Sequence, residues 1–230
     1  MKRAVGQQLD KLKSRLGGYA GMLMYRYANI CVEANPIALL SVEVEVEDEL
    51  KKIEEVAQVA VHETYHFAVI PNYEDDIFAI GKAVMLEHPE FKQEIKSLDG
   101  FDEDDPAGKF LFYTMPEVNK DRRDVILKAV DSFYDECTQQ MGSATQDCLT
   151  QLAVLQTGSS PAEIEQVAEA VKQIGDYYNT VRDTCRDKKK EEVEKAYADY
   201  QKRQAEKEAQ EQEEQQEKGN PLQMNLNIEN

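Results

Sequence analysis

Two long stretches of apolar residues at helical spacing fill the second half of the chain and constrain its fold more than any other feature. Asn119 is placed to cap the first helix, and Gly158 is placed to end it. The second helix begins at Ser160–Glu163, a capping box with proline at the first helical position. Its apolar residues keep a strict 3-4 spacing, which is typical of helices packed side by side with left-handed crossing. We therefore predict a helical bundle.

The two apolar stripes are long enough for several turns of packing. The first consists of Ile126, Ala129, Phe133, Cys137, Met141, Ala144, Cys148, Leu152 and Leu155, and the second of Ile164, Val167, Val171, Ile174, Tyr178, Val181 and Cys185. Three of the four cysteines lie on these stripes, and we interpret them as small core residues rather than as ligands.

A third helix is predicted over residues 5–31, where apolar residues again recur near helical spacing. Gly17, Gly18 and Gly21 interrupt it, and we interpret them as places where another helix approaches closely. Pro36 then ends the pattern. Two long stripes need a third partner, and this helix supplies one.

The middle of the chain has a different pattern. Residues 42–46 alternate between valine and glutamate, which predicts a strand. Residues 57–70 fit either two strands or the continuation of a helix that begins near Asp48. A helix is expected over 74–87, an acidic loop over 99–108 and a strand over 110–115. This region is therefore predicted to form a small α/β unit.

The predicted fold class is α+β, an elongated three-helix bundle with a small inserted α/β domain. Residues 1–41 and 115–200 are expected to form the bundle, and residues 42–114 the inserted domain. Residues 201–230 are expected to form a charged helical extension, a coiled-coil tail, followed by a disordered end.

The net charge of −18 is unevenly distributed. Residues 1–30 carry six basic residues and one acidic residue, whereas residues 31–116 carry six basic and twenty acidic residues. Such an acidic chain is a poor generic binder of nucleic acid, and we expect no DNA partner. No apolar run approaches a membrane span, and the N-terminus lacks the apolar core of a signal peptide, so we expect a cytoplasmic protein with no membrane partner.

His62, Glu63 and His66 fit H-E-x-x-H, in which two histidines on one helical face bind zinc and the glutamate acts as general base. No further ligand motif follows, and the only other histidine is His88. We interpret these residues as part of a turn or surface and expect no metal. Since no other catalytic motif is present, we expect no cofactor and no enzymatic activity.

Five strings in order carry a resemblance to a known family. They are Glu33–Leu39; Val44–Glu45 with Ile53–Ala57 and Val59–Val61; Ala79–Val84; Met115–Arg123; and Lys172–Tyr178 with Lys188–Val193. Over roughly residues 5–200 the chain resembles the ribosome recycling factor family. The resemblance implies a three-helix bundle with an inserted α/β domain, and it places residues 62–66 at the turn of a β-hairpin. It also implies a protein that clears post-termination ribosomes together with an elongation-factor motor.

The same resemblance identifies RNA-contact positions, and most of them are substituted here. The family's arginines match Ile30, Glu33, Gly142 and Thr145. The basic residues that remain for RNA contact are Arg122, Arg123, Lys11, Lys13 and Arg15. For the first two of these, a purely structural role at a helix start is the alternative. The resemblance thus implies a retained fold with a degenerate RNA-binding surface.

Three functional hypotheses follow. The first is a non-enzymatic, ribosome-recycling-factor-like protein that acts on post-termination ribosomes, with the ribosome or another translation component as its partner. The second is an adaptor or regulator on the same scaffold that binds a basic protein through its acidic inserted domain. The third is a zinc hydrolase built on His62, Glu63 and His66.

Overall fold

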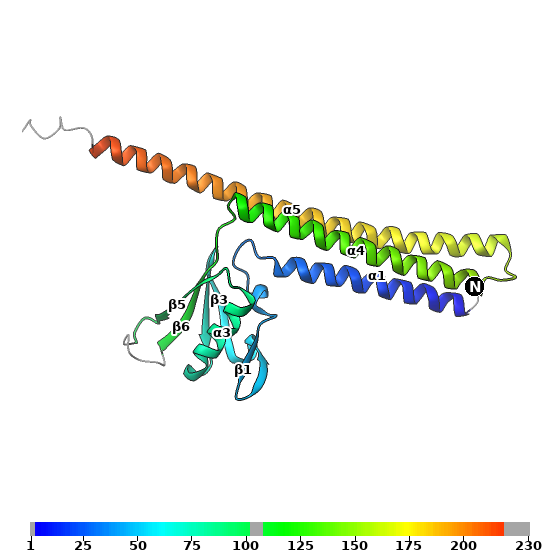
Figure 1. The fold of residues 1–230 in the computed structure, drawn as a ribbon, viewed down its shortest axis with the longest axis horizontal. Coiled ribbons are helices and arrows are strands. Elements are labelled where there is room, and N and C mark those ends of the chain that lie inside the picture. The colour runs from blue at the N-terminus through cyan, green and yellow to red at the C-terminus, as the bar shows by residue number, and fades with distance from the viewer. Residues whose placement is uncertain (1–2, 102–107, 219–230) are drawn as a thin grey trace, which may run out of the picture.

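Three long helices form the rod of the molecule. The computed structural model describes residues 3–101 and 108–218, so residues 102–107 of the predicted acidic loop and the predicted disordered end lie outside the described residues. Helices α1 (Arg3–Asn29), α4 (Lys120–Leu155) and α5 (Pro161–Lys218) lie side by side, as Figure 1 shows. The inserted unit lies at one end of this rod, and α5 continues past it. The predicted α+β fold class is confirmed.

The predicted helix signals act as expected. The Asn119 side chain accepts a hydrogen bond from the backbone N–H of Arg122 at 2.9 Å. The Ser160 N–H donates to the Glu163 carboxylate at 3.0 Å, and the Glu163 N–H donates back to the Ser160 hydroxyl at 3.4 Å. Gly158 has φ +79°, a left-handed conformation that favours glycine. Caps and breakers therefore fix where the long helices begin and end.

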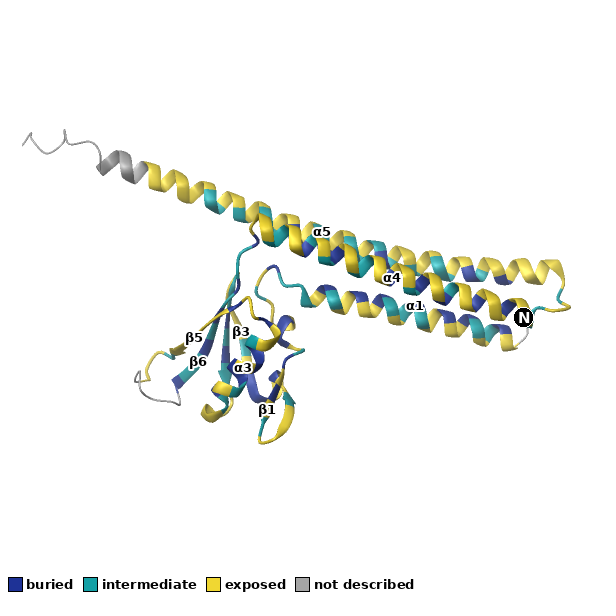
Figure 2. Cartoon of the chain, viewed as in Figure 1, coloured by how far each residue is buried: buried dark blue, intermediate teal, exposed yellow. Residues whose placement is uncertain are grey.

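The bundle core follows the predicted stripes, with a few exceptions. Figure 2 shows buried residues along the facing sides of the three helices. Ile164, predicted to lie on the stripe, is 44% exposed. A Cβ at Gly17 would lie 3.1 Å from the Tyr178 hydroxyl, which confirms a close helix approach there. Gly18 and Gly21 have no neighbour within 4 Å of such a Cβ, so the same interpretation was wrong for them.

The inserted unit has its own core and two sheets. Strands β1 (Glu43–Val46) and β2 (Glu49–Lys52) form a hairpin, followed by the short helix α2 (Ile53–Val56). A second, antiparallel sheet has the order β3-β4-β6-β5, and it consists of β3 (Ala57–Glu63), β4 (His66–Pro71), β6 (Lys109–Thr114) and β5 (Lys92–Ser97). Helix α3 (Ile77–Glu87) and two 3₁₀ turns, Pro36–Leu39 and Glu74–Asp76, complete the unit.

Residues 57–70, which fitted two alternatives, form the β3–β4 hairpin. Val59 pairs with Val69 and Val61 with Phe67, so apolar side chains from both strands lie opposite one another. Phe67 and Val69 are fully buried in the core of the unit. The alternative of a helix that continues from Asp48 is therefore wrong, because the backbone N–H and C=O groups of these residues form the antiparallel hydrogen bonds between β3 and β4. Within the described part of the chain, none of the helices is long and apolar enough to cross a membrane.

The turn between β1 and β2 is conformationally strained. Glu47 and Asp48 are its two central residues, with φ values of 54° and 63°. Two positive φ values define a type I′ turn, which strongly favours Asn-Gly. Residues with a Cβ pay a conformational penalty in this region, and a long side chain such as glutamate is uncommon there.

We predict that replacing this pair by the favoured one, Glu47→Asn with Asp48→Gly, stabilises the protein by about 1 kcal/mol. The measurement is urea unfolding followed by circular dichroism. Glu49→Gly is the control, because Glu49 lies in β2 rather than in the turn, and this change should destabilise. Equal effects of the two changes would contradict the strain argument.

Cys137 and Cys148 are buried and Cys31 and Cys185 half-buried, and burial raises the pKa of all four thiols, that of Cys31 to about 11. Because the thiolate is the reactive form, we predict that iodoacetamide at pH 8 modifies Cys31 at least about tenfold more slowly in the folded protein than in urea. Mass spectrometry of the modified peptides measures the two rates. Equal rates would contradict this assignment.

Candidate nucleic-acid interface

Ile30 and Glu33, the first two positions that the resemblance assigns to RNA contact, lie beyond the end of α1. The helix ends at Asn29 rather than at residue 31, so Ile30, which was predicted within the helix, lies just beyond it, and Glu33 lies four residues past its end. Ile30 is half-buried and packs against the bundle core. Glu33 is exposed in the segment that leads into the inserted unit. Ile30 therefore covers apolar core, and Glu33 presents a carboxylate where the family resemblance implies a cation.

The other two positions lie on α4 and line one groove between α4 and α5. This groove has a volume of about 570 Å³. Gly142 is exposed, and a Cβ at this position would meet no neighbouring atom within 4 Å. The Thr145 hydroxyl donates to the Met141 carbonyl at 2.9 Å and offers no charge. Lys172 and Asp176 face the same groove, so its lining carries both signs of charge.

The structure does not bring the four positions together. Leu16 lines the same groove as Gly142, so it marks the level of that groove on α1. It lies thirteen residues before Asn29, where α1 ends and the segment with Ile30 and Glu33 begins. At 1.5 Å per residue this separation is about 20 Å. The substituted positions are therefore two separate patches along the rod, one in the groove and one at the entry to the inserted unit.

Arg122 serves the junction between rod and inserted unit. Its guanidinium donates to the carbonyl oxygen of Cys31 at 3.0 Å and to that of Pro116. The first carbonyl belongs to the segment that leaves the rod, and the second to the segment that returns. Burial lowers the pKa of Arg122, which reflects the loss of water around its charge. This side chain is a structural clamp.

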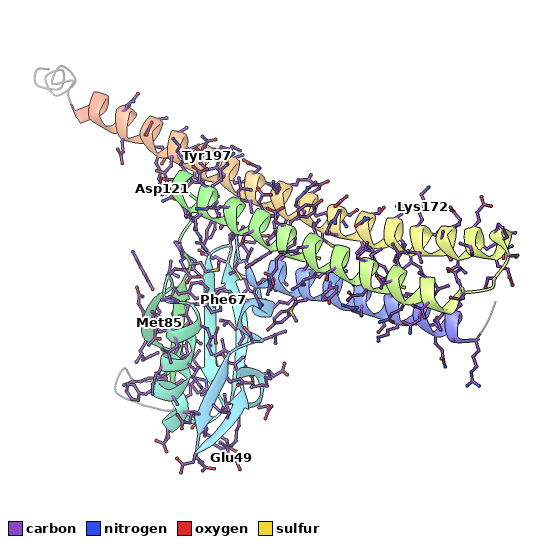
Figure 3. All side chains as sticks on the ribbon, turned by 45° about the vertical axis from the view of Figure 1, so that its right-hand side comes forward. Glu49, Phe67, Met85, Asp121, Lys172 and Tyr197 are labelled. Carbon is purple, nitrogen blue, oxygen red and sulfur yellow. The ribbon has the colours of Figure 1, made fainter. Side chains whose placement is uncertain are left out.

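Two further candidate cations are held by acidic partners. Arg123 forms hydrogen bonds of 2.6 and 2.8 Å to the Glu194 carboxylate and lies over the Tyr197 ring at 5.2 Å. Figure 3 shows the labelled Asp121 and Tyr197 close together where α4 begins beside α5. Arg15 pairs with Asp147 at 3.1 Å. These ion pairs connect neighbouring helices, and the carboxylates neutralise the guanidinium charges that an RNA phosphate would need.

Lys11 and Lys13 differ from the other cations. Both are exposed, and neither makes an ion pair among the residues that the structure describes. Lys13 lines a hollow of about 410 Å³ together with Tyr177 and Tyr178. These two lysines are therefore the candidate cations available for a phosphate.

Sequence reasoning missed Tyr177. Its side chain is 62% exposed beside Lys13, and its ring meets Tyr178 edge-on at 5.0 Å. An exposed aromatic ring beside a lysine is typical of surfaces that stack unpaired bases. Tyr178 was predicted on the apolar stripe, and the residue before it on a helix must point about 100° away. This angular offset from the apolar stripe could have predicted that the Tyr177 ring is exposed.

The histidine motif lies on the β3–β4 hairpin, which confirms its predicted place. His66 stacks on Phe112 at 5.1 Å, and its Nδ1 lies 3.2 Å from the Glu63 carboxylate. His62 meets the same phenylalanine at 5.9 Å. Strand geometry replaces the helical face that a zinc protease requires. Among the described residues, no three His, Cys, Asp or Glu side chains are grouped to hold a metal.

The hairpin turn is tied into the junction instead. The Thr64 carbonyl accepts from the Ala34 N–H at 2.7 Å, and the Tyr65 carbonyl accepts from the Met115 N–H at 2.8 Å. Arg203 of α5 donates to the Tyr65 hydroxyl at 2.9 Å and to Glu117 at 3.2 Å. The motif residues thus border a structural contact between the inserted unit and the rod.

A rod of three helices with a small α/β unit inserted after the first helix is the architecture of a class of translation factors, and the comparisons agree. A family model described as "Ribosome recycling factor" matches residues 27–194. The chain belongs to the ribosome recycling factor family. No curated protein sequence matches it.

Two solved structures share the fold. A solution structure of the ribosome recycling factor superposes with a TM-score of 0.70 at 14% identity, covering 85% of this chain and all of the other. The second comes from models for the T. thermophilus ribosome recycling factor and the E. coli elongation factor G bound to the E. coli post-termination complex. Its TM-score is 0.55 at 18% identity, with 82% of this chain and 98% of the other covered.

The neighbouring arginines give a direct test of the clamp. We predict that Arg122→Met lowers the free energy of unfolding by about 1–3 kcal/mol, because two carbonyl groups at the junction lose their donor. Arg122→Lys should lose most of the same stability, since an ammonium group lacks the planar fork that reaches both oxygens. Arg123→Met, which removes an exposed pair, should have a smaller effect. Urea unfolding measures all three, and a larger loss for Arg123→Met would contradict the assignment.

Proposed function

We propose that this protein binds ribosomes after termination and helps to clear them, as a non-enzymatic factor of the cytoplasm that needs no cofactor. The observation that carries the proposal is the family match over residues 27–194, which spans both segments that join the rod to the inserted unit. The clamp formed by Arg122 at that junction indicates that the rod and the inserted unit are held in a defined arrangement, which supports the proposal. The name of one structural neighbour refers to a post-termination complex, which makes the ribosome and its elongation factor the partners proposed here.

We further propose that the RNA-facing surface has moved along the rod. The positions that the resemblance assigned to arginine now hold Ile30, Glu33, Gly142 and Thr145. Lys11 and Lys13 offer charge on α1, and the ring of Tyr177 lies beside Lys13, where it offers stacking. Two phosphate contacts in place of four imply weaker binding and a shallower dependence on salt.

Neither rival hypothesis gains support from the comparisons. The matched family and the two solved structures described above are ribosome recycling factors, and they give no support to an adaptor that replaces the ribosomal role. The zinc hydrolase requires a helical H-E-x-x-H segment, whereas residues 62–66 belong to a hairpin.

Co-sedimentation with ribosomes over a salt series tests the proposal. Wild type should bind at low salt, and Lys11→Gln with Lys13→Gln should weaken binding and reduce the slope of log K against log salt by up to about two units. Glu33→Arg with Gly142→Arg should strengthen binding and steepen that slope. Both positions are exposed, and a side chain at Gly142 has open space, so folding should tolerate the change.

The control is Glu208→Arg with Gln210→Arg, which adds the same charge on the exposed extension of α5. If it strengthens binding as much as the first pair, only net charge matters and the assigned positions are wrong. Absence of wild-type binding at low salt would refute the ribosomal role itself.

A further inference from the structure

An apolar groove lies on the inserted unit, away from the rod. Phe78 and Leu86 on α3 are 77% and 73% exposed, and Leu50 on β2 is 70% exposed. These side chains line one groove of about 420 Å³ between α3 and the β1–β2 hairpin. Large apolar side chains are scattered over most protein surfaces, but several of them gathered in one groove indicate a binding site.

The geometry of the groove favours a helix as its occupant. Phe78, Lys82 and Leu86 follow one another at every fourth residue along α3, which spans about 12 Å. The opposite wall is the side-chain face of a hairpin, with Glu43 and Glu45 of β1 beside Leu50. Glu45 and Leu50 are paired in register and therefore lie on one face of the hairpin, and an amphipathic helix fits such a face better than an added strand does.

The charge of the groove walls indicates which charge the bound helix carries. Glu43 and Glu45 line the groove together with one cation, Lys82, and the hairpin residues 43–52 as a whole carry five acidic and two basic residues. Figure 3 shows the labelled Glu49 at the outer end of the hairpin and the labelled Met85 on α3, the two elements that form the groove. A nucleic acid, an anionic membrane or a second copy of this chain would meet repulsion there.

We propose that the groove between α3 and the β1–β2 hairpin binds a basic amphipathic helix of a partner protein. The apolar face of that helix covers Phe78, Leu86 and Leu50, and its basic residues meet the acidic hairpin. This surface is separate from the lysines of α1 and from the junction. The proposal therefore stands independently of where RNA binds.

A synthetic peptide provides the test. The probe is an amphipathic helix of leucine and lysine, about 14 residues long, with one tryptophan on its apolar face. The chain contains no tryptophan, so the fluorescence reports the peptide alone. Wild type should bind the peptide and shift its emission to the blue. Phe78→Ser with Leu86→Ser should weaken binding at least tenfold without any change in charge.

Matched variants separate the groove from general attraction to an acidic protein. Val154→Ser with Ile164→Ser removes exposed apolar side chains at the far end of the rod and should leave binding unchanged. Leu50→Ser, on the other wall, gives a second test should the α3 variant fold poorly, and circular dichroism checks both. A leucine–glutamate version of the peptide should not bind.

Three results would overturn the proposal. The first is equal binding by wild type and by both groove variants. The second is sedimentation showing a wild-type dimer that Phe78→Ser with Leu86→Ser makes monomeric, which would assign the groove to a second copy. The third is tighter peptide binding by a chain shortened after Lys218, which would assign the groove to the chain's own end.

Discussion

The whole arrangement depends on how one guanidinium satisfies the two segments that cross between rod and inserted unit. Arg122 stands in the first turn of α4 and donates to a carbonyl of the outgoing segment, at Cys31, and to one of the returning segment, at Pro116. Buried carbonyl groups need donors, and a planar donor that reaches both holds the segments together. The Asn119 cap, which accepts from the backbone N–H of Arg122, fixes where that side chain starts.

Helix α5 completes the junction, and this explains part of its length. Arg203 reaches the hydroxyl of Tyr65, at the β3–β4 turn, and the carboxylate of Glu117. A helix that ended level with the start of α4 would not carry an arginine to that point. The contact therefore requires α5 to continue past the rod, as Figure 1 shows. His62, Glu63 and His66 of the zinc-like motif lie beside this contact, as part of the β3–β4 hairpin.

Much of the fold was predictable, because long periodic patterns and caps act locally. The stripes of α4 and α5, Asn119 and the Ser160–Glu163 box needed no tertiary information. Strand β2 was missed because its turn, Glu47–Asp48, lacks the asparagine and glycine that announce a hairpin. Strand β5 was missed because an exposed edge strand such as Lys92–Ser97 has little apolar alternation.

The candidate site was less predictable than the fold, since it depends on what each side chain faces. Arg122 and Arg123 are neighbours in sequence, yet one enters the junction and the other pairs with Glu194 on α5. Sequence reasoning offered a structural role at the helix start as the alternative for both arginines, but it could not tell which partner each would contact. The same limit applies to Ile30, whose half-buried position follows from the end of α1 at Asn29.

Family membership and surface chemistry are separable in this protein for a physical reason. The fold rests on buried stripes and on the junction, whereas the substituted positions Glu33 and Gly142 are exposed and contribute little to either. Replacing a cation at such an exposed position leaves the free energy of unfolding nearly unchanged but lowers the affinity for a polyanion. With six basic residues and one acidic residue in residues 1–30, against a large acidic excess in residues 31–116, RNA attracts α1 and repels the inserted unit. Under the proposed ribosomal role, this opposition would turn α1 toward RNA and the groove beside α3 away from it, toward the proposed protein partner.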